Sequence, residues 1–386
     1  MRQARCVLST YSADVFGVCS ALYELGGMLV MHDASGCNST YSTHDEPRWF
    51  GGDSMVFISG LTEIDAIMGN DSRVVNDMLQ AIEQLHPAFA ALAGTPIPML
   101  TGCDLTSVAA EVERVSGTPC FGFNTNGMRS YLCGASEAFA ALAERMTDER
   151  AVKRRGTVNV LGATPLDFSV NGSVESAAEI LGGDGWEVIG TWAMGSTLGQ
   201  LRRAGEAEVN LVISGAGMKT AQVLRRRFGT PWVVGMPVGT AFTGQVLRAL
   251  RDTARDGQDR MAFADYEAPT AGGFFIIGES VISRSLAAAF RLECGVTPRV
   301  ICPLERLPEL EGVLSPGDVS ASEEYEIQRL CADAGIVAAD PLYRPVLPQR
   351  CQFISLPHEA FSGRLARKDI PDLTKMDLKK IYGGIL

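Results

Sequence analysis

Short apolar runs alternate along the chain with longer segments in which apolar residues recur at helical spacing. The short runs predict buried strands, and the longer segments predict amphipathic helices. Residues 11–25 form the first helical pattern, which a Gly-Gly pair ends. The runs at 28–31 and 54–59 predict two buried strands, and residues 72–85 predict an amphipathic helix.

The alternation continues through the rest of the chain. Residues 96–100 predict a strand, 101–104 a tight turn and 106–115 a helix, after which 117–123 predict another strand. Later apolar runs predict strands at 272–278, 298–302, 335–341 and 351–356. Strands separated by helices are typical of parallel sheets covered on both faces. We therefore predict an α/β fold made of three Rossmann-like subdomains with parallel sheets.

Two charged stretches indicate where the subdomains meet. Residues 146–156 read MTDERAVKRRG, and residues 251–260 mix acidic with basic side chains. The predicted domains are residues 1–150, 151–255 and 256–386, and the last of these ends in a helical tail.

Composition agrees with a folded protein of several domains. The chain has 386 residues, of which 46% are hydrophobic and 20% charged, and this is ample material for large cores. No apolar run approaches the length of a membrane span, and the N-terminus lacks the apolar centre of a signal peptide. We therefore expect a cytoplasmic protein without a membrane partner.

Net charge and cysteine content narrow the function further. A net charge of -11 argues against a nucleic-acid partner, and the basic run 225–227 fits the end of a helix that faces solvent. Ten cysteines are too few for a disulfide scaffold of this length. Most of them are expected to pack in cores, and a few to act as ligands.

Standard nucleotide motifs are missing. Residues 214–220, SGAGMKT, follow a predicted strand and open a helix as a phosphate loop does, but the Gly-Lys pair and the four-residue spacer are absent. The GxGxxG fingerprint of dinucleotide-binding folds is also absent. We therefore expect no ATP or NAD site of a standard kind.

Residues 32–71 form a loop region with little periodicity and a concentration of reactive side chains. Cys37 lies at its centre between Gly and Asn, and Cys6 and Cys103 lie in other predicted turns. The remaining cysteines considered lie in apolar runs that predict packing: Cys19, Cys120, Cys294, Cys302 and Cys331. The spacings of 31 and 66 residues between the three turn cysteines match no zinc or ferredoxin pattern, so spacing alone leaves metal binding and packing both open.

The order of these motifs resembles the N-terminal domain of nitrogenase component 1 subunits. The resemblance rests on Cys6 before the glycine-bearing helix, HDASGC ending at Cys37, LTEID followed by GND within 61–71, and TGC ending at Cys103. It continues through the TWAMGS segment and the run from 210 to 232, so it covers most of the first 245 residues.

This resemblance implies that Cys6, Cys37 and Cys103 hold an iron-sulfur cluster at a subunit interface, making residues 1–150 the cluster-binding domain. The cluster is expected to be of the four-iron four-sulfur or P-cluster-like kind. It also implies an anaerobic electron-transfer protein that forms a homodimer or a heterodimer with a paralogous subunit. A separate iron protein that hydrolyses ATP is expected to donate the electrons.

Departures from the family pattern limit what the chain is expected to reduce. The position that resembles the cysteine ligand of the iron-molybdenum cofactor is Ser214, and the chain is shorter than a nitrogenase subunit. We therefore expect no iron-molybdenum cofactor. The resemblance then implies a nitrogenase-like reductase of small molecules such as tetrapyrroles or carbon-sulfur compounds. A non-catalytic scaffold for metallocofactor assembly and a plain α/β binding protein are the alternatives.

Candidate catalytic residues come from the same loop region. His32, His44 and Arg48 are the candidates for catalysis in a cleft between the subdomains. His32 also fits a structural hydrogen-bonding function at the end of a strand, and His44 fits a solvated loop. Other polar candidates are Asn38, Asp45, Asn126, Arg129 and His358.

Overall fold

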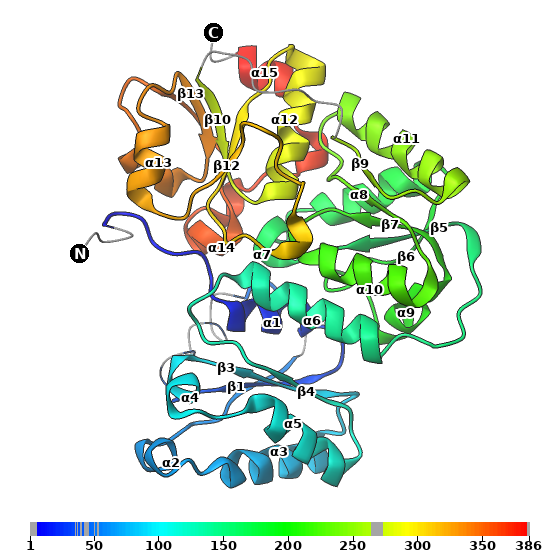
Figure 1. Ribbon diagram of the computed structural model, residues 1–386, viewed down its shortest axis with the longest axis vertical. Helices are drawn as coiled ribbons and strands as arrows, with labels where there is room; N and C mark the ends of the chain where they lie inside the picture. Colours follow the sequence, from blue (N-terminus) through cyan, green and yellow to red (C-terminus); the bar gives the residue numbers. More distant parts are fainter. Residues whose placement is uncertain are drawn as a thin grey trace.

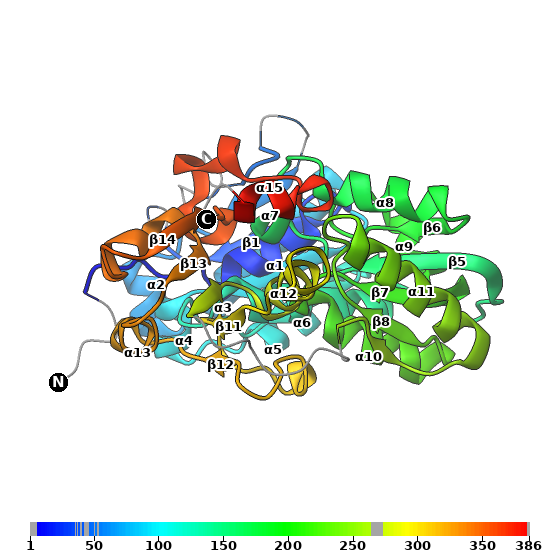
Figure 2. The same ribbon diagram turned by 90° about the horizontal axis from the view of Figure 1, so that it is seen from above.

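Three parallel sheets form the protein, which is described by a computed structural model at residues 6–34, 36, 38, 41, 46–49, 51, 54–263 and 273–383. The first sheet lies at one end of the long axis, and the second and third lie side by side at the other end (Figure 1). The view from above also places the second and third sheets on opposite sides of the molecule (Figure 2). The predicted α/β fold with three parallel-sheet units is confirmed.

The first sheet has the strand order β2-β1-β3-β4. Its strands are β1 (Met28–His32), β2 (Met55–Ile58), β3 (Ala90–Gly94) and β4 (Cys120–Phe123). Its helices are α1 (Asp14–Leu22), α2 (Glu63–Met68), α3 (Asp71–Leu85), α4 (Pro96–Thr101), α5 (Leu105–Ser116) and α6 (Tyr131–Arg145). Side chains alternate across the sheet, so Met28 and Val30 pack with α3 and α5, whereas Leu29 and Met31 pack with α1 and α6.

The second sheet has the order β6-β5-β7-β8-β9. Its strands are β5 (Arg154–Leu161), β6 (Glu187–Gly190), β7 (Ala207–Val212), β8 (Trp232–Val234) and β9 (Arg260–Met261). Its helices are α7 (Pro165–Phe168), α8 (Ser173–Gly183), α9 (Leu198–Arg202), α10 (Met218–Phe228) and α11 (Ala241–Asp256). The charged stretch at 251–260 therefore holds the end of α11 and the start of β9, and the domain boundaries remain predictions.

The third sheet has the order β12-β11-β10-β13-β14. Its strands are β10 (Phe274–Ile277), β11 (Arg299–Cys302), β12 (Val319–Ser320), β13 (Ile336–Ala339) and β14 (Gln352–Ser355). The helices of this part are α12 (Ser280–Cys294), α13 (Glu324–Leu330), α14 (Glu359–Ser362) and α15 (Leu378–Gly383). Among the described helices, none combines the length and the apolar character that crossing a membrane requires.

Most predicted elements of the first unit are confirmed, with one exception. The strand predicted at 96–100 is wrong, because these residues form helix α4 and the strand is β3 just before it. Pro96 and Pro98 have no N–H to donate to a sheet, and Pro96 occupies the first turn of α4, where proline is well tolerated. The sequence of β3, AALAG, consists mostly of small residues with weak strand preference, so the sequence pattern does not predict this strand.

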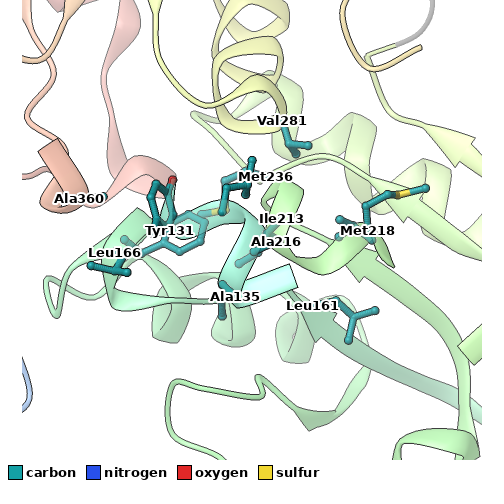
Figure 3. Packing of buried hydrophobic residues seen from close by; sticks show 14 of the residues in the cluster. Tyr131, Ala135, Leu161, Leu166, Ile213, Ala216, Met218, Met236, Val281 and Ala360 are labelled. Atoms are coloured by element: carbon teal, nitrogen blue, oxygen red, sulfur yellow. The ribbon is translucent and has the colours of Figure 1, made fainter. Parts of the chain in front are cut away.

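Helices α1 and α6 cross at very short range and tie the first unit to the other two. A Cβ atom on Gly17 would lie 2.0 Å from the Tyr131 carbonyl oxygen, and one on Gly134 would lie 1.9 Å from that of Asp14. Only glycine permits this approach. A single hydrophobic core continues from here into both other units, and Figure 3 shows Tyr131 of α6 within it together with Leu166.

Candidate functional site

Three side chains able to bind a metal ion converge at the carboxyl end of the first sheet. His32 ends β1, Asp71 begins α3, and Cys103 lies between α4 and α5. One ligand atom from each lies within 4.8 Å of the other two. Carboxyl ends of parallel strands form the crevice in which α/β proteins bind ligands. Sequence analysis had singled out His32 and Cys103 but had taken Asp71 only as part of a turn.

The protonation states of this group favour the histidine as a metal ligand but disfavour the thiol. His32 is buried, and its Nδ1 lies 2.8 Å from the Ser59 hydroxyl oxygen. Burial lowers the pKa of His32, which favours the neutral imidazole that metals bind. Burial, followed by the charge of Asp71, raises the pKa of the Cys103 thiol to about 12. A metal ion bound here therefore has to displace the thiol proton.

The other predicted ligands are not assembled with Cys103 in the described part of the chain. Cys6 is exposed, and the backbone N–H groups of Cys6, Val7 and Leu8 donate to Oε2 of Glu324 at 2.9, 2.8 and 2.9 Å. Glu324 begins α13, so this segment is held by the third unit, and no strand precedes α1 within 6–13. Cys37 lies outside the described residues, and the three-cysteine ligand set remains a prediction.

Of the predicted catalytic residues, His44 also lies outside the described residues. Arg48 is nearly buried, with Nε 2.7 Å from Oε1 of Glu46 and Nη1 2.5 Å from the carbonyl oxygen of Ala193. Its guanidinium also lies 4.7 Å from the centre of the Tyr23 ring. These contacts connect the first unit to the second, so Arg48 stabilises the packing of the two units. A catalytic function of Arg48 remains a prediction.

A cleft of about 1090 Å³ opens between the first unit, the third unit and the C-terminal segment. Its lining residues come from 10–16, 127–133, 303–307, 322 and 360–365, and none comes from the second unit. Arg129, a predicted polar candidate, lines it and pairs with Asp14. Arg306 and Arg364 also line it and are exposed, and neither forms an ion pair or hydrogen bond with another described residue.

A second, small cavity of about 60 Å³ lies where the three units meet. Tyr11 of the N-terminal segment, Asp167 of α7, Glu279 before α12 and His358 before α14 all line it. The sequence analysis noted His358 but missed the two carboxylates. A signal for them exists, because Glu279 comes two residues after β10 and Asp167 follows soon after β5, at the ends where parallel strands place ligand-binding residues.

Asp167 is the hub of the hydrogen bonds at this junction. Its Oδ2 accepts from the Ser214 hydroxyl at 2.7 Å, and its Oδ1 accepts a short hydrogen bond from the Tyr131 hydroxyl. Nε2 of His358 lies 3.4 Å from the same Oδ1. Ser214, which resembles a cofactor-ligand position, therefore has its hydroxyl engaged inside the protein.

Glu279 is almost completely buried, at 1% exposure, and its carboxylate accepts from backbone groups at the start of α12. The N–H groups of Val281 and Ile282 donate to it at 3.0 Å each, and that of Gly215 donates at 3.3 Å. Burial, followed by the charge of Asp167, raises the pKa of Glu279 to about 7, although the backbone donors act in the opposite direction.

The same contacts explain why the SGAGMKT turn is unsuited to phosphate. The Gly215 N–H is used by the Glu279 carboxylate, and a Cβ atom on Gly217 would lie 2.5 Å from the Leu161 carbonyl carbon. This turn therefore packs against β5 instead of forming an open cradle. The finding agrees with the missing Gly-Lys pair of the motif.

Three parallel-sheet units that meet at a small buried cavity, with a cysteine at the carboxyl edge of the first sheet, define a class of three-unit α/β folds. The family model of nitrogenase component 1 type oxidoreductases matches residues 14–311, and the chain belongs to this family. The predicted family is thus confirmed. A solved structure titled "Nitrogenase Cp1 at pH 6.5" superposes with a TM-score of 0.70 at 14% identity, covering 100% of this chain and 94% of the other, which shows the shared fold.

Curated relatives match at low identity. The iron-molybdenum cofactor biosynthesis protein NifE of Klebsiella pneumoniae is 26% identical over 208 residues, covering 50% of this chain and 45% of NifE. The molybdenum-iron protein alpha chain of Methanosarcina barkeri is 24% identical, with coverages of 64% and 47%. One of the subunits of the light-independent protochlorophyllide reductase of Chlorobium luteolum is 26% identical, with coverages of 54% and 42%. The chain spans about half the length of these relatives.

Proposed function

We propose that the chain is the catalytic component of a nitrogenase-like, ATP-dependent two-component reductase. In this proposal an iron-sulfur cluster at a subunit interface is held by Cys6, Cys37 and Cys103, and a separate iron protein supplies the electrons. The observation that carries the proposal is the position of Cys103 at the edge of the first sheet, beside His32 and Asp71.

Cys103 supplies the one sulfur donor of the described group, and in this proposal Cys6 and Cys37 supply the others that an iron-sulfur cluster needs. Thiolate sulfur is the ligand that such clusters prefer, and the neutral His32 and the Asp71 carboxylate add nitrogen and oxygen donors at the same place. When bound, the cluster supplies low-potential transfer of single electrons. The protein part of the task is to hold the thiolates in place and to limit access of water, and the buried end of β1 supports both.

An exposed apolar surface beside Cys103 supports a subunit interface. Helices α2 and α4 contact each other and expose large apolar side chains. The α2–α4 surface consists of Ile64, Ile67, Met68, Ile97, Met99 and Leu100, of which Ile64, Ile67, Met68 and Leu100 are 73%, 76%, 74% and 78% exposed. Contiguous apolar surface of this kind marks protein interfaces. A homodimer or a heterodimer with a paralogous subunit fits it.

The side chains that line the cleft support the proposal that the substrate is a small anionic molecule. Arg306 and Arg364 face it without an acidic partner among the described residues, and guanidinium groups recognise carboxylate and phosphate. Met128 and Leu365, at 76% and 84% exposure, border the same cleft and offer contact to an apolar body. A molecule that combines an apolar body with anionic groups therefore fits best.

Placing ATP hydrolysis on a separate protein is supported by the closed SGAGMKT turn. Its Gly215 N–H is occupied by Glu279, so this turn has no open site for a phosphate. In this proposal the driving force for low-potential reduction comes from the partner protein.

The test is anaerobic turnover with a small anionic substrate in the presence and absence of an iron protein and MgATP. Cys103→Ala is expected to abolish turnover, whereas the matched variant Cys120→Ala, a buried cysteine of β4, is expected to keep it. Equal turnover with a chemical reductant alone would contradict the two-component mechanism.

The alternative is a non-catalytic scaffold for metallocofactor assembly. Ser214 in place of a cofactor cysteine and the similarity to NifE favour it. A wild-type chain that carries iron, fails to turn over with the iron protein, and passes a metal cluster to an acceptor protein would support the scaffold over the reductase.

A further inference from the structure

The junction cavity brings together two buried carboxyl groups from different units and a histidine. We propose that Asp167 and Glu279 share a proton and that His358 and Tyr11 connect this proton to the cleft, where reduction consumes protons. The delivery of protons to a reduction rests on the proposed reductase function, whereas the shared proton itself can be observed in a chain that does not turn over.

The Ser214–Gly215 dipeptide joins the two carboxyl groups. The Ser214 hydroxyl donates to Asp167 at 2.7 Å, and the N–H of the next residue, Gly215, donates to Glu279 at 3.3 Å. Both carboxyl side chains are buried and line the same cavity. Two ionised carboxylates that line one buried cavity repel each other, so one proton between them is the stable arrangement.

The charge balance at the cavity also favours a bound proton. Asp340 contributes a third buried acidic group, and no lysine or arginine is among the described residues that line the cavity. Glu359, a buried acidic residue outside the cavity, is already paired with Arg367 at 2.6 Å. The titratable groups that face the pair from the surrounding elements are His358, Tyr11, Tyr131, Asp340, Tyr343 and Cys302.

His358 is suited to carry the proton. Neither ring nitrogen has a hydrogen-bond partner among the described residues, and Nε2 lies 3.4 Å from Asp167. The ring lies edge-on to Tyr11, with 5.5 Å between centroids. The cavity of about 60 Å³ is lined mainly by apolar side chains, and its carboxyl groups and His358 are the partners to which water would bind on the proposed path.

Tyr11 forms the wall between the cavity and the cleft, since it lines both. In this route the proton leaves the carboxyl pair and binds Nε2 of His358, and the Tyr11 hydroxyl then accepts a proton from His358 and releases its own toward the cleft. Solvent then returns a proton to the pair by the same route, so the pair is restored after each transfer.

Infrared spectroscopy of the metal-free chain tests the shared proton directly. The C=O band of a protonated carboxyl group is expected near neutral pH in the wild type and is expected to disappear as the pH is raised. Glu279→Gln is expected to remove this titrating band and Asp167→Asn to shift its titration, whereas Glu359→Gln, which removes a buried carboxylate outside the cavity, is expected to leave it unchanged. A band that is absent from the wild type, or unaffected by Glu279→Gln, would overturn the inference.

Hydrogen-deuterium exchange of that band tests the route. His358→Leu and Tyr11→Phe are expected to slow the exchange at least tenfold, whereas Tyr41→Phe, a buried tyrosine bonded to Glu46 in the first unit, is expected to leave it unchanged. Equal exchange rates in all variants would refute the route. If the wild type shows the titrating C=O band but no turnover that depends on the iron protein, the proposed reductase function alone is contradicted. If it shows that turnover but no such band, the shared proton alone is contradicted.

Discussion

Replacing Glu279 by Gln is expected to make the free energy of unfolding less dependent on pH. Glu279 is buried, and the folded protein holds the pKa of its carboxyl at about 7 against an ordinary value of 4.5. Gln has the same shape and keeps one oxygen, which can accept from the N–H of Val281 as Oε1 does now, but its amide NH2 then stands where Oε2 accepts from the N–H of Ile282. The substitution therefore removes the titration at the cost of one hydrogen bond at the start of α12, and this cost does not depend on pH.

The sign follows from where each state holds the proton. Below the unfolded pKa of 4.5 both states are protonated, and as pH rises from there to about 7 only the folded state keeps the proton. The wild type therefore loses stability over this window, and the difference in pKa corresponds to about 3 kcal/mol at about 1.4 kcal/mol per pH unit. The Gln variant loses none of it.

Chemical denaturation followed by circular dichroism measures the effect. The free energy of unfolding of Glu279→Gln minus that of the wild type is expected to rise by about 3 kcal/mol between about pH 4.5 and about pH 8. The matched variant Glu83→Gln, which replaces an exposed carboxyl of α3, is expected to give a difference that stays flat. A flat difference for Glu279→Gln as well would refute the account of the junction.

Three further outcomes are expected. Ile67→Glu on the α2–α4 surface is expected to convert the dimer to a monomer, as measured by light scattering. Val152→Glu, at a similarly exposed site in the charged stretch 146–156, is expected to leave the dimer intact. A dimer that persists in Ile67→Glu would show that the interface lies elsewhere. Gly134→Ala is expected to lower the free energy of unfolding by more than about 3 kcal/mol, because it disrupts the α1–α6 crossing. Gly244→Ala, which has open space around it in α11, is expected to raise the free energy of unfolding by up to about 1 kcal/mol. Binding of the iron protein to this acidic chain is expected to weaken as salt concentration rises, and salt-independent binding would exclude electrostatic docking.

Periodicity in the sequence predicts most elements of the first sheet, because short unbroken apolar runs such as β1 and amphipathic helices such as α3 carry strong local signals. It fails at β3, whose alanines fit a buried strand only because the neighbouring strands pack against them on both sides. The two prolines after it define a helix start, yet the apolar residues Ile97, Met99 and Leu100 beside them imitate a strand.

The candidate sites were predictable in unequal measure. His32 and Cys103 stand at predicted ends of local elements, so sequence analysis singled them out, but the approach of Asp71 depends on the strand order β2-β1-β3, which no local pattern determines. The pairing of Asp167 with Glu279 depends on how the second unit packs on the third. Such contacts arise from tertiary packing and leave no periodic trace in the sequence.

The most direct test of the central claim is the iron content and electron paramagnetic resonance spectrum of the anaerobically purified chain. The wild type is expected to carry an iron-sulfur signal that Cys6→Ala, Cys37→Ala and Cys103→Ala abolish or alter, whereas Cys19→Ala and Cys331→Ala, both in the buried core, are expected to keep it at some cost in packing. A Cys37→Ala protein with full iron content and an unchanged spectrum would contradict the cluster assignment.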